Sequence, residues 1–88
     1  MGWQIELTDA AHKQLKKLGQ VEAKRIRDYL RERVQPLEDP RQLGKPLQGN
    51  MGELWRYRVG DYRLIAQIED ERVCVLVVRI GHRREVYR

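Results

Sequence analysis

The stretch ELWRYRVGDYRLIAQIE, residues 53–69, decides the fold of this chain. Apolar and polar side chains alternate on both sides of Gly60-Asp61, and the two runs are rich in aromatic and β-branched residues, which favour strands. A two-residue connection that begins with glycine is typical of a tight hairpin turn. The stretch therefore predicts two antiparallel strands, Glu53–Val59 and Tyr62–Glu69.

The two faces of this hairpin differ in chemistry, because successive side chains of a strand point to opposite faces. One face carries aromatic and apolar side chains, which we expect to pack against helices: Trp55, Tyr57, Val59, Tyr62 and Leu64. The other face carries Arg56, Arg58 and Arg63, and we expect it to stay open. In the predicted register Arg58 lies directly opposite Arg63, where like charges repel each other.

The rest of the chain supplies the remaining elements of an α+β fold. They are, in order, a strand at Trp3–Leu7, a helix between the N-cap Thr8 and Gly19, a second helix at Val21–Val34, a loop at Arg41–Gly52 and a strand at Arg72–Ile80. We therefore expect an N-terminal strand, a two-helix hairpin and a three-stranded antiparallel meander. All strands should form one sheet with the helices packed on one face.

The composition limits what this chain can be. Its 88 residues predict a single domain, residues 1–88, with one modest core. The longest apolar run, Val73–Val78, is far shorter than the ~20 residues of a membrane-spanning helix. Glu6 and Asp9 interrupt any N-terminal signal segment, so we expect a cytoplasmic protein with no membrane partner. A single cysteine, Cys74, excludes an internal disulfide, and two histidines without ligand spacing predict no metal or other cofactor.

An excess of positive charge points to a polyanionic partner. Eighteen lysine and arginine residues stand against thirteen aspartate and glutamate residues, which gives a net charge of +5. Three arginines share one face of the predicted hairpin without an acidic residue among them, and guanidinium groups bind phosphate oxygens well. The third strand returns toward Arg63, so the tail adds cationic and aromatic groups at the same end: His82, Arg83, Arg84, Tyr87 and Arg88. Arginine combined with aromatic residues is typical of single-stranded RNA recognition.

Three segments resemble the RelE/ParE superfamily of toxins from toxin–antitoxin systems: Lys45-Pro46-Leu47, Asp61-Tyr62-Arg63-Leu64-Ile65 and Gly81-His82-Arg83-Arg84-Glu85-Val86-Tyr87. The resemblance covers essentially the whole chain and points to the RelE branch. It implies a messenger-RNA endonuclease that acts in the ribosomal A site, where it meets mRNA and small-subunit ribosomal RNA. It also implies a RelB-like antitoxin that wraps and neutralises the toxin, and contact with operator DNA only through that antitoxin.

The same resemblance assigns roles to individual residues. Arg63 matches the strand arginine that contacts the scissile phosphate, Arg83 matches an arginine proposed as general acid or phosphate ligand, and Tyr87 matches the tyrosine on which a substrate base stacks. Arg56 and Arg58 complete the expected catalytic set and stand where RelE itself has two lysines. The expected supporting RNA-binding residues are His82, Arg84, Lys45 and Arg88. The tail is shorter than in RelE, so either Arg83 or Arg84 takes the phosphate role.

The chemistry that the resemblance implies needs no metal ion. A ribose 2′-oxygen attacks the adjacent phosphate and leaves a 2′,3′-cyclic phosphate and a 5′-hydroxyl. Arginine side chains suit the stabilisation of the added negative charge. Arginine stays protonated where lysine can lose its proton, so the proton acceptor stays open among His82, Glu85 and Arg58.

Two other functions stay open. A toxin of the ParE-like branch poisons DNA gyrase and cleaves no RNA, although such members generally lack this combination of arginine and tyrosine. A non-catalytic protein would serve only as antitoxin partner and operator co-repressor, and it would show no activity in a translation extract.

Overall fold

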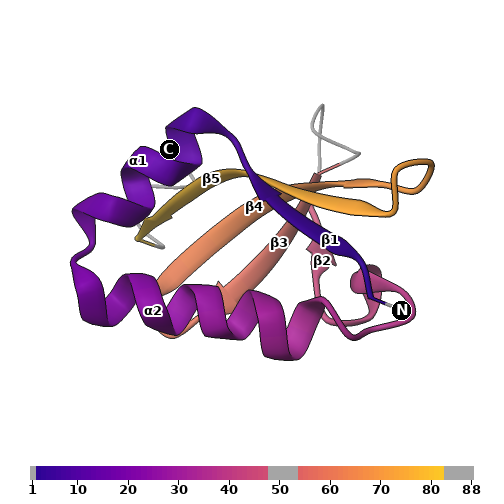
Figure 1. Cartoon of the computed structure of the whole chain (residues 1–88), viewed down its shortest axis with the longest axis horizontal. Helices are drawn as coiled ribbons and strands as arrows, with labels where there is room; N and C mark the ends of the chain where they lie inside the picture. The colour runs from indigo at the N-terminus through magenta and orange to yellow at the C-terminus, as the bar shows by residue number, and fades with distance from the viewer. Residues whose placement is uncertain (1, 48–53, 83–88) are drawn as a thin grey trace.

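A computed structural model describes residues 2–47 and 54–82, which form a five-stranded sheet and two helices (Figure 1). The strands are β1 (Gln4–Leu7), β2 (Lys45–Pro46), β3 (Leu54–Val59), β4 (Tyr62–Glu69) and β5 (Cys74–His82). Their order in the sheet is β1-β5-β4-β3-β2, with β1 parallel to β5 and every other pair antiparallel. The predicted α+β class, the N-terminal strand and the three-stranded meander are confirmed.

The helices begin and end where the local sequence directs them. Helix α1 (Asp9–Lys17) starts at Thr8, whose Oγ1 accepts a hydrogen bond of 3.1 Å from the backbone N–H of Ala11. Gly19, with φ of +89°, then turns the chain into α2 (Gln20–Tyr29).

The second predicted helix is helical over its whole length, but its last turn differs from an α-helix. Residues Leu30–Val34 form a π-turn, in which the N–H of Gln35 donates to the carbonyl oxygen of Leu30 at 2.8 Å. Leu30 and Val34 are both buried. Their spacing of four residues fits an α-helix equally well, so the sequence pattern does not reveal the wider turn. Within the described part of the chain, neither helix is long and apolar enough to cross a bilayer.

The loop predicted at Arg41–Gly52 contains regular structure in its described part, so that prediction was incomplete. Pro40–Gln42 is a 3₁₀ turn, and the two-residue strand β2 pairs with β3, Lys45 opposite Arg56 and Pro46 opposite Trp55. Proline is tolerated there because β2 is an edge strand, where its missing N–H costs no ladder hydrogen bond. Two residues are too few to show the alternation that identifies a strand from sequence.

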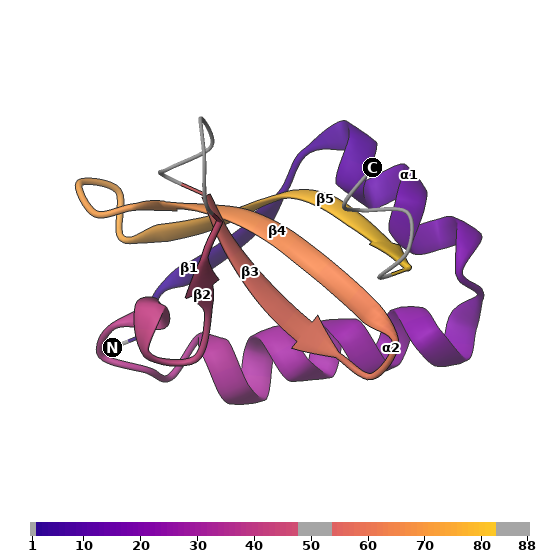
Figure 2. The same cartoon turned by 180° about the vertical axis from the view of Figure 1, so that it is seen from behind.

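The hairpin of β3 and β4 has the predicted register. Val59 lies opposite Tyr62 and Arg58 opposite Arg63, and Gly60 takes the positive φ of +60° that the turn requires. The aromatic face is covered by α2, while Figure 2 shows β3 and β4 from the opposite, uncovered side. The core contains side chains of both helices and of β3, β4 and β5, among them Leu15, Ile26, Tyr57, Leu64, Val75 and Ile80.

Tyr57 is the largest fully buried side chain. Its Oη donates a 2.8 Å hydrogen bond to the carbonyl oxygen of Pro40. A Cβ added at Gly44 would lie only 3.1 Å from the Tyr57 ring, so glycine allows the loop to approach that closely. Trp55 is only half-buried, near the β2 edge, with the Arg41 guanidinium 5.8 Å from its ring centroid.

The outer edge of β5 is covered by α1 beyond the point where β1 ends. The Thr8 hydroxyl donates to the carbonyl oxygen of Val78 at 3.2 Å, and the Gln14 side-chain oxygen accepts from the N–H of Ile80 at 2.7 Å. A bulge interrupts the β4–β5 ladder here, because Ala66 pairs with Val77 while the preceding Ile65 pairs with Arg79.

Candidate nucleic-acid interface

Four cations gather on the uncovered face of the sheet. Lys45 of β2, Arg56 and Arg58 of β3 and Arg63 of β4, here called the arginine cluster, line a hollow of about 150 Å³ together with Leu43. Among the residues that the structure describes, no carboxylate lines this hollow. The sequence prediction that Arg56, Arg58 and Arg63 share the open face is confirmed in the structure.

Strand pairing forces these cations close together. Lys45 is the cross-strand partner of Arg56, and Arg58 is the partner of Arg63. Directly opposed residues have Cβ atoms about 4.5–5.5 Å apart, and like charges at that separation destabilise a sheet. A bound anion would remove this repulsion, and a phosphate group accepts several guanidinium hydrogen bonds. The arrangement is therefore suited to a phosphate ligand.

Arg63 differs from the other members in its burial. We expected an open position, but only 9% of its surface is exposed, because β4 is a central strand with a neighbour on each side. Its Nη1 donates a 3.2 Å hydrogen bond to the backbone carbonyl of Tyr62. This contact holds the guanidinium in one orientation, whereas Arg58 is exposed.

The loop that leads to Lys45 is anchored to the sheet by an ion pair and a buried hydrogen bond. Arg41 forms a bidentate ion pair with Asp70 of the β4–β5 turn, with N–O distances of 3.1 and 2.6 Å, and also contacts Asp39 at 3.2 Å. The hydrogen bonds from Arg41 hold the pKa of the Asp70 carboxyl below its ordinary value. These two acidic side chains are thus engaged by Arg41, and the hydrogen bond from Tyr57 to Pro40 fixes the same loop from within.

Of the remaining predicted residues the structure describes only His82, which is not among the residues that line the hollow. His82 is the cross-strand partner of Tyr62, which packs against the core, so it lies on the helix-covered face of the sheet. Its ring meets the Tyr62 ring edge-on, with centroids 6.0 Å apart. The other tail residues lie outside the described residues: Arg83, Arg84, Glu85, Tyr87 and Arg88. Across residues 2–47 and 54–82, no three His, Cys, Asp or Glu side chains come close enough to hold a metal ion.

Sequence reasoning missed Arg79. It pairs with Ile65, which pairs with Arg56, so Arg79 belongs to the same face as the arginine cluster. Val75 and Val77 are buried, and strict alternation from them would place Arg79 on the core face as well. The bulge at Val78 shifts the alternation by one residue. A charged residue at a position that alternation assigns to the core was the one signal available.

Comparison with known proteins identifies the family. A model of the family described as "ParE toxin of type II toxin-antitoxin system, parDE" matches residues 5–87. The chain is 33% identical over 92 residues to the mRNA interferase toxin RelE of Escherichia coli, in an alignment that covers 99% of this chain and 92% of RelE. The chain therefore belongs to the family of type II toxin–antitoxin toxins. More particularly, it is a RelE-like toxin of such a system.

Two further comparisons agree with this assignment. Toxin RelG of Mycobacterium tuberculosis is 38% identical over 50 residues, a match that covers 57% of this chain and 58% of RelG, little more than half of either protein. The toxin–antitoxin complex RelBE2 of the same organism contains a chain that superposes with a TM-score of 0.85 at 26% identity, covering 94% of this chain and 100% of that one. The resemblance to the RelE/ParE superfamily is thus confirmed.

Proposed function

We propose that this toxin is a ribosome-dependent endoribonuclease that cleaves messenger RNA in the A site without a metal ion. The observation that carries the proposal is the arginine cluster: four cations, brought together from three strands, line one hollow. The similar toxin of Escherichia coli is named an mRNA interferase, which supports RNA as the substrate.

The geometry suggests how the cluster would act. Arg63 is oriented by its contact with the Tyr62 carbonyl and would hold the scissile phosphate in a fixed position. Arg56 and Arg58 approach from β3 and would stabilise the negative charge that builds up on the phosphate oxygens. A positioned charge of this kind acts without reorganisation, which is why removal of one such donor costs roughly 10²–10³-fold in rate.

The proton balance defines what the cluster leaves to other groups. The 2′-hydroxyl oxygen attacks phosphorus and loses its proton, the bond from phosphorus to the 5′-oxygen breaks, and that oxygen takes up a proton. Arginine side chains stay protonated, so the arginine cluster can stabilise negative charge but leaves both proton transfers to other groups. We propose that the ribosome aligns the message for this attack, so that cleavage of free RNA is slow.

The partner follows from the same charges. We propose that an antitoxin covers the arginine cluster with an acidic segment, because a polyanionic surface would match four clustered cations. The solved RelBE2 complex contains a similar toxin chain together with its antitoxin, which supports such a partner. Association should be fast at low ionic strength and slow at high ionic strength.

The test is primer extension on messenger RNA after a short pulse of toxin expression. Arg58→Gln and Arg63→Gln should each reduce cleavage by roughly 10²–10³-fold. Arg33→Gln, which removes the same charge from an exposed position outside the cluster, should cleave like the wild type. Because Arg63 is nearly buried, its variant is also checked for a normal melting temperature.

Two results would contradict the proposal. Variants of Arg58 and Arg63 that stay fully toxic would exclude the arginine cluster as the site. Growth arrest by the wild type without any new RNA ends would exclude cleavage, and a gyrase supercoiling assay would then test the ParE-like alternative.

A further inference from the structure

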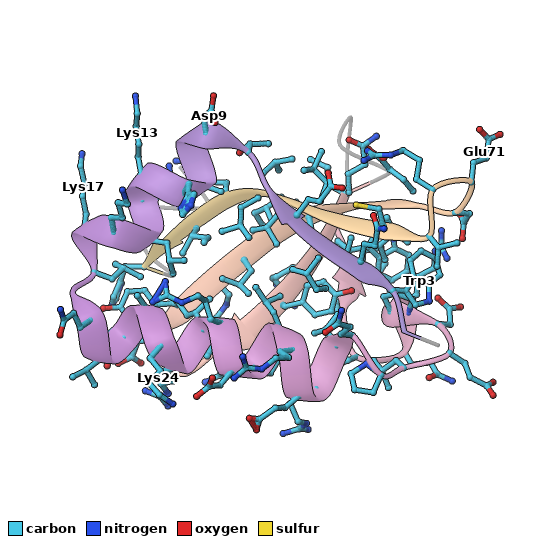
Figure 3. The ribbon with its side chains drawn as sticks, viewed as in Figure 1. Trp3, Asp9, Lys13, Lys17, Lys24 and Glu71 are labelled. Atoms are coloured by element: carbon cyan, nitrogen blue, oxygen red, sulfur yellow. The ribbon has the colours of Figure 1, made fainter. Side chains whose placement is uncertain are left out.

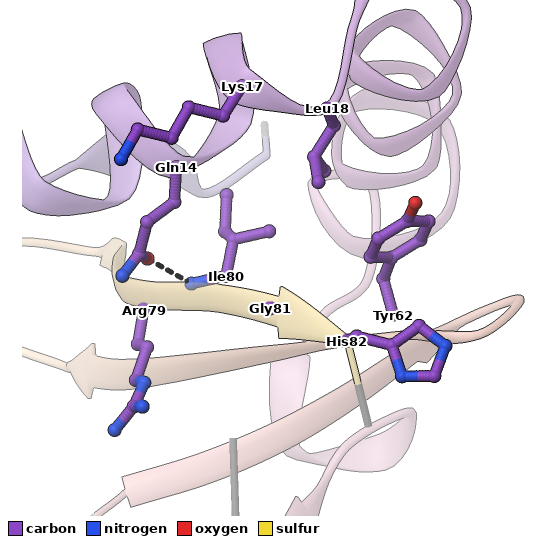
Figure 4. A pocket seen from close by; sticks show the side chains of 8 residues that line it. All are labelled: Gln14, Lys17, Leu18, Tyr62, Arg79, Ile80, Gly81 and His82. Carbon is purple, nitrogen blue, oxygen red and sulfur yellow. Dashed lines mark hydrogen bonds between the residues drawn. The ribbon is translucent and has the colours of Figure 1, made fainter. Parts of the chain in front are cut away.

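A second cationic position lies at the edge of the sheet, outside the hollow of the arginine cluster. Arg79 is exposed on β5, and its side chain points away from α1 in Figure 4. Arg79, Ile65 and Arg56 form one row across three strands. Two strand spacings separate the backbones at Arg79 and Arg56 by about 10 Å. Ile65 stands between them and is only 4% exposed.

Arg79 belongs to a different concavity from the cluster. A groove of about 440 Å³ runs along the outer edge of β5, lined by Gln14, Lys17, Leu18, Tyr62, Arg79, Ile80, Gly81 and His82. Lys17 extends from α1 on one side of β5 and Arg79 extends on the other (Figure 4). The described residues that line this groove include no carboxylate. The groove meets the cluster through Gly81, whose cross-strand partner is Arg63.

The cations of α1 differ from those of α2 in their partners. Lys24 of α2 and Arg31 of the π-turn that follows it contact Asp28 at 2.6 and 2.8 Å, so these two cations are paired with a carboxylate of the same helical segment. On α1, none of the lysines forms an ion pair with the part of the chain that the structure describes: Lys13, Lys16 and Lys17. Figure 3 shows Lys13 and Lys17 extending from α1 away from the sheet. Lys17 lines the groove and has no carboxylate partner within the described part of the chain, so an anion that reaches the groove can draw this long side chain toward it.

We propose that Lys17 and Arg79 form a second phosphate-binding position, which holds an RNA phosphate near the one bound by the arginine cluster. This inference rests on the proposed function. It implies that the RNA strand crosses the sheet from β3 toward β5 and leaves over the β5 edge. The bulge at Val78 has a specific role here, because it turns Arg79 to the open face.

The inference is tested by the salt dependence of binding to an RNA octamer with 2′-O-methyl groups, which cannot be cleaved. Each phosphate contact on a single strand contributes about 0.7 to the slope of log K against log salt concentration. Arg79→Ala should therefore lower the slope by about 0.7, and Lys17→Ala should lower it by no more than that. If the two side chains share one phosphate, the double variant should also lose only about 0.7.

The controls separate this position from bulk charge and from the cluster. Arg33→Ala, an exposed charge on the π-turn after α2, should leave the octamer slope unchanged. A 2′-O-methyl dinucleoside monophosphate has a single phosphate, so its affinity should fall with Arg63→Gln but not with Arg79→Ala. Since both probes measure binding without cleavage, a failed cleavage assay and a failed octamer assay have separate meanings.

Several outcomes would overturn the inference. One is an Arg79→Ala variant whose salt slope for octamer binding equals that of the wild type. A second is an Arg33→Ala variant whose slope falls as much as that of Arg79→Ala. A third is a fall of about 1.4 in the slope of the double variant, which would mean two independent phosphate contacts. Undetectable octamer binding by the wild type would also overturn it. So would weaker antitoxin capture by Arg79→Ala with unchanged octamer binding, because the groove would then be a protein interface.

Discussion

Replacement of Arg58 by glutamine should stabilise the toxin while it disables the site. Arg58 is exposed, lies directly opposite Arg63 and lines a hollow in which the structure describes four cations and no carboxylate. Glutamine keeps a long polar side chain on the strand and removes one of the two opposed charges. The substitution therefore relieves repulsion without opening a cavity, and the relief is expected as a gain in the free energy of unfolding.

The size of the gain follows from the pairing. A like-charge pair directly opposed in a sheet costs roughly 0.2–1 kcal/mol. For a chain of this length, 1 kcal/mol shifts the melting temperature by about 4–8 °C, so Arg58→Gln should melt about 1–8 °C higher than the wild type. At 1 M salt the Debye length is about 3 Å, and the difference should largely disappear.

The assay is thermal unfolding followed by circular dichroism at low salt and at 1 M salt, with Arg33→Gln as the variant of equal charge. Inorganic phosphate should raise the melting temperature of the wild type more than that of Arg58→Gln, because a ligand of the folded state stabilises it. A lower melting temperature for Arg58→Gln at low salt would refute the reasoning. The reasoning would also be refuted if Arg33→Gln melted as much above the wild type at low salt as Arg58→Gln does, since the lower net charge alone would then explain the gain.

Three other substitutions and reactions test the surrounding structure. Tyr57→Phe leaves the buried Pro40 carbonyl without its hydrogen bond and should lower the free energy of unfolding by about 1–3 kcal/mol. Urea titration measures this loss, and an unchanged unfolding midpoint would contradict the contact. Cys74 is fully buried, and burial raises the pKa of its thiol, so alkylation should be slow in the native protein and fast in urea, and rapid native labelling would contradict its placement. The Asp70 carboxyl has a lowered pKa in the folded state, so its ion pair stabilises the fold above the ordinary aspartate pKa of about 3.9. The wild type should therefore be more stable than Asp70→Asn at neutral pH and lose that advantage as the solution is acidified. If the stabilities of the two proteins fell in parallel with decreasing pH, the ion pair would be contradicted.

The hairpin could be predicted from sequence because its evidence is local. Alternation across Leu54–Glu69 and a glycine with positive φ fixed the register that opposes Arg58 to Arg63. The arginine face followed from that register alone. The same reasoning did not extend to burial, since whether Arg63 is exposed depends on which strands flank β4, and that is a property of the whole sheet.

The features that sequence reasoning missed are those that break a period or span few residues. The bulge at Val78 shifts Arg79 from the core face to the open face, and the only local sign of the shift is the charge of Arg79 itself, at a position that alternation assigns to the core. The strand β2 has two residues, so it carries no alternation. The parallel pairing of β1 with β5 joins residues about 70 positions apart along the chain, for example Gln4 with Cys74, which hydrophobic patterning alone does not identify.

Cleavage on purified ribosomes tests the ribonuclease proposal most directly. Ribosomes are programmed with a short message that leaves a defined codon in the empty A site, the toxin is added, and the new RNA ends are mapped and their chemistry determined. We predict a cut within that codon with a 2′,3′-cyclic phosphate on the upstream fragment, much slower cleavage of the same message without ribosomes, and a loss of roughly 10²–10³-fold with Arg58→Gln but none with Arg33→Gln. An intact message on toxin-treated ribosomes, or equal cleavage by Arg58→Gln and the wild type, would contradict it.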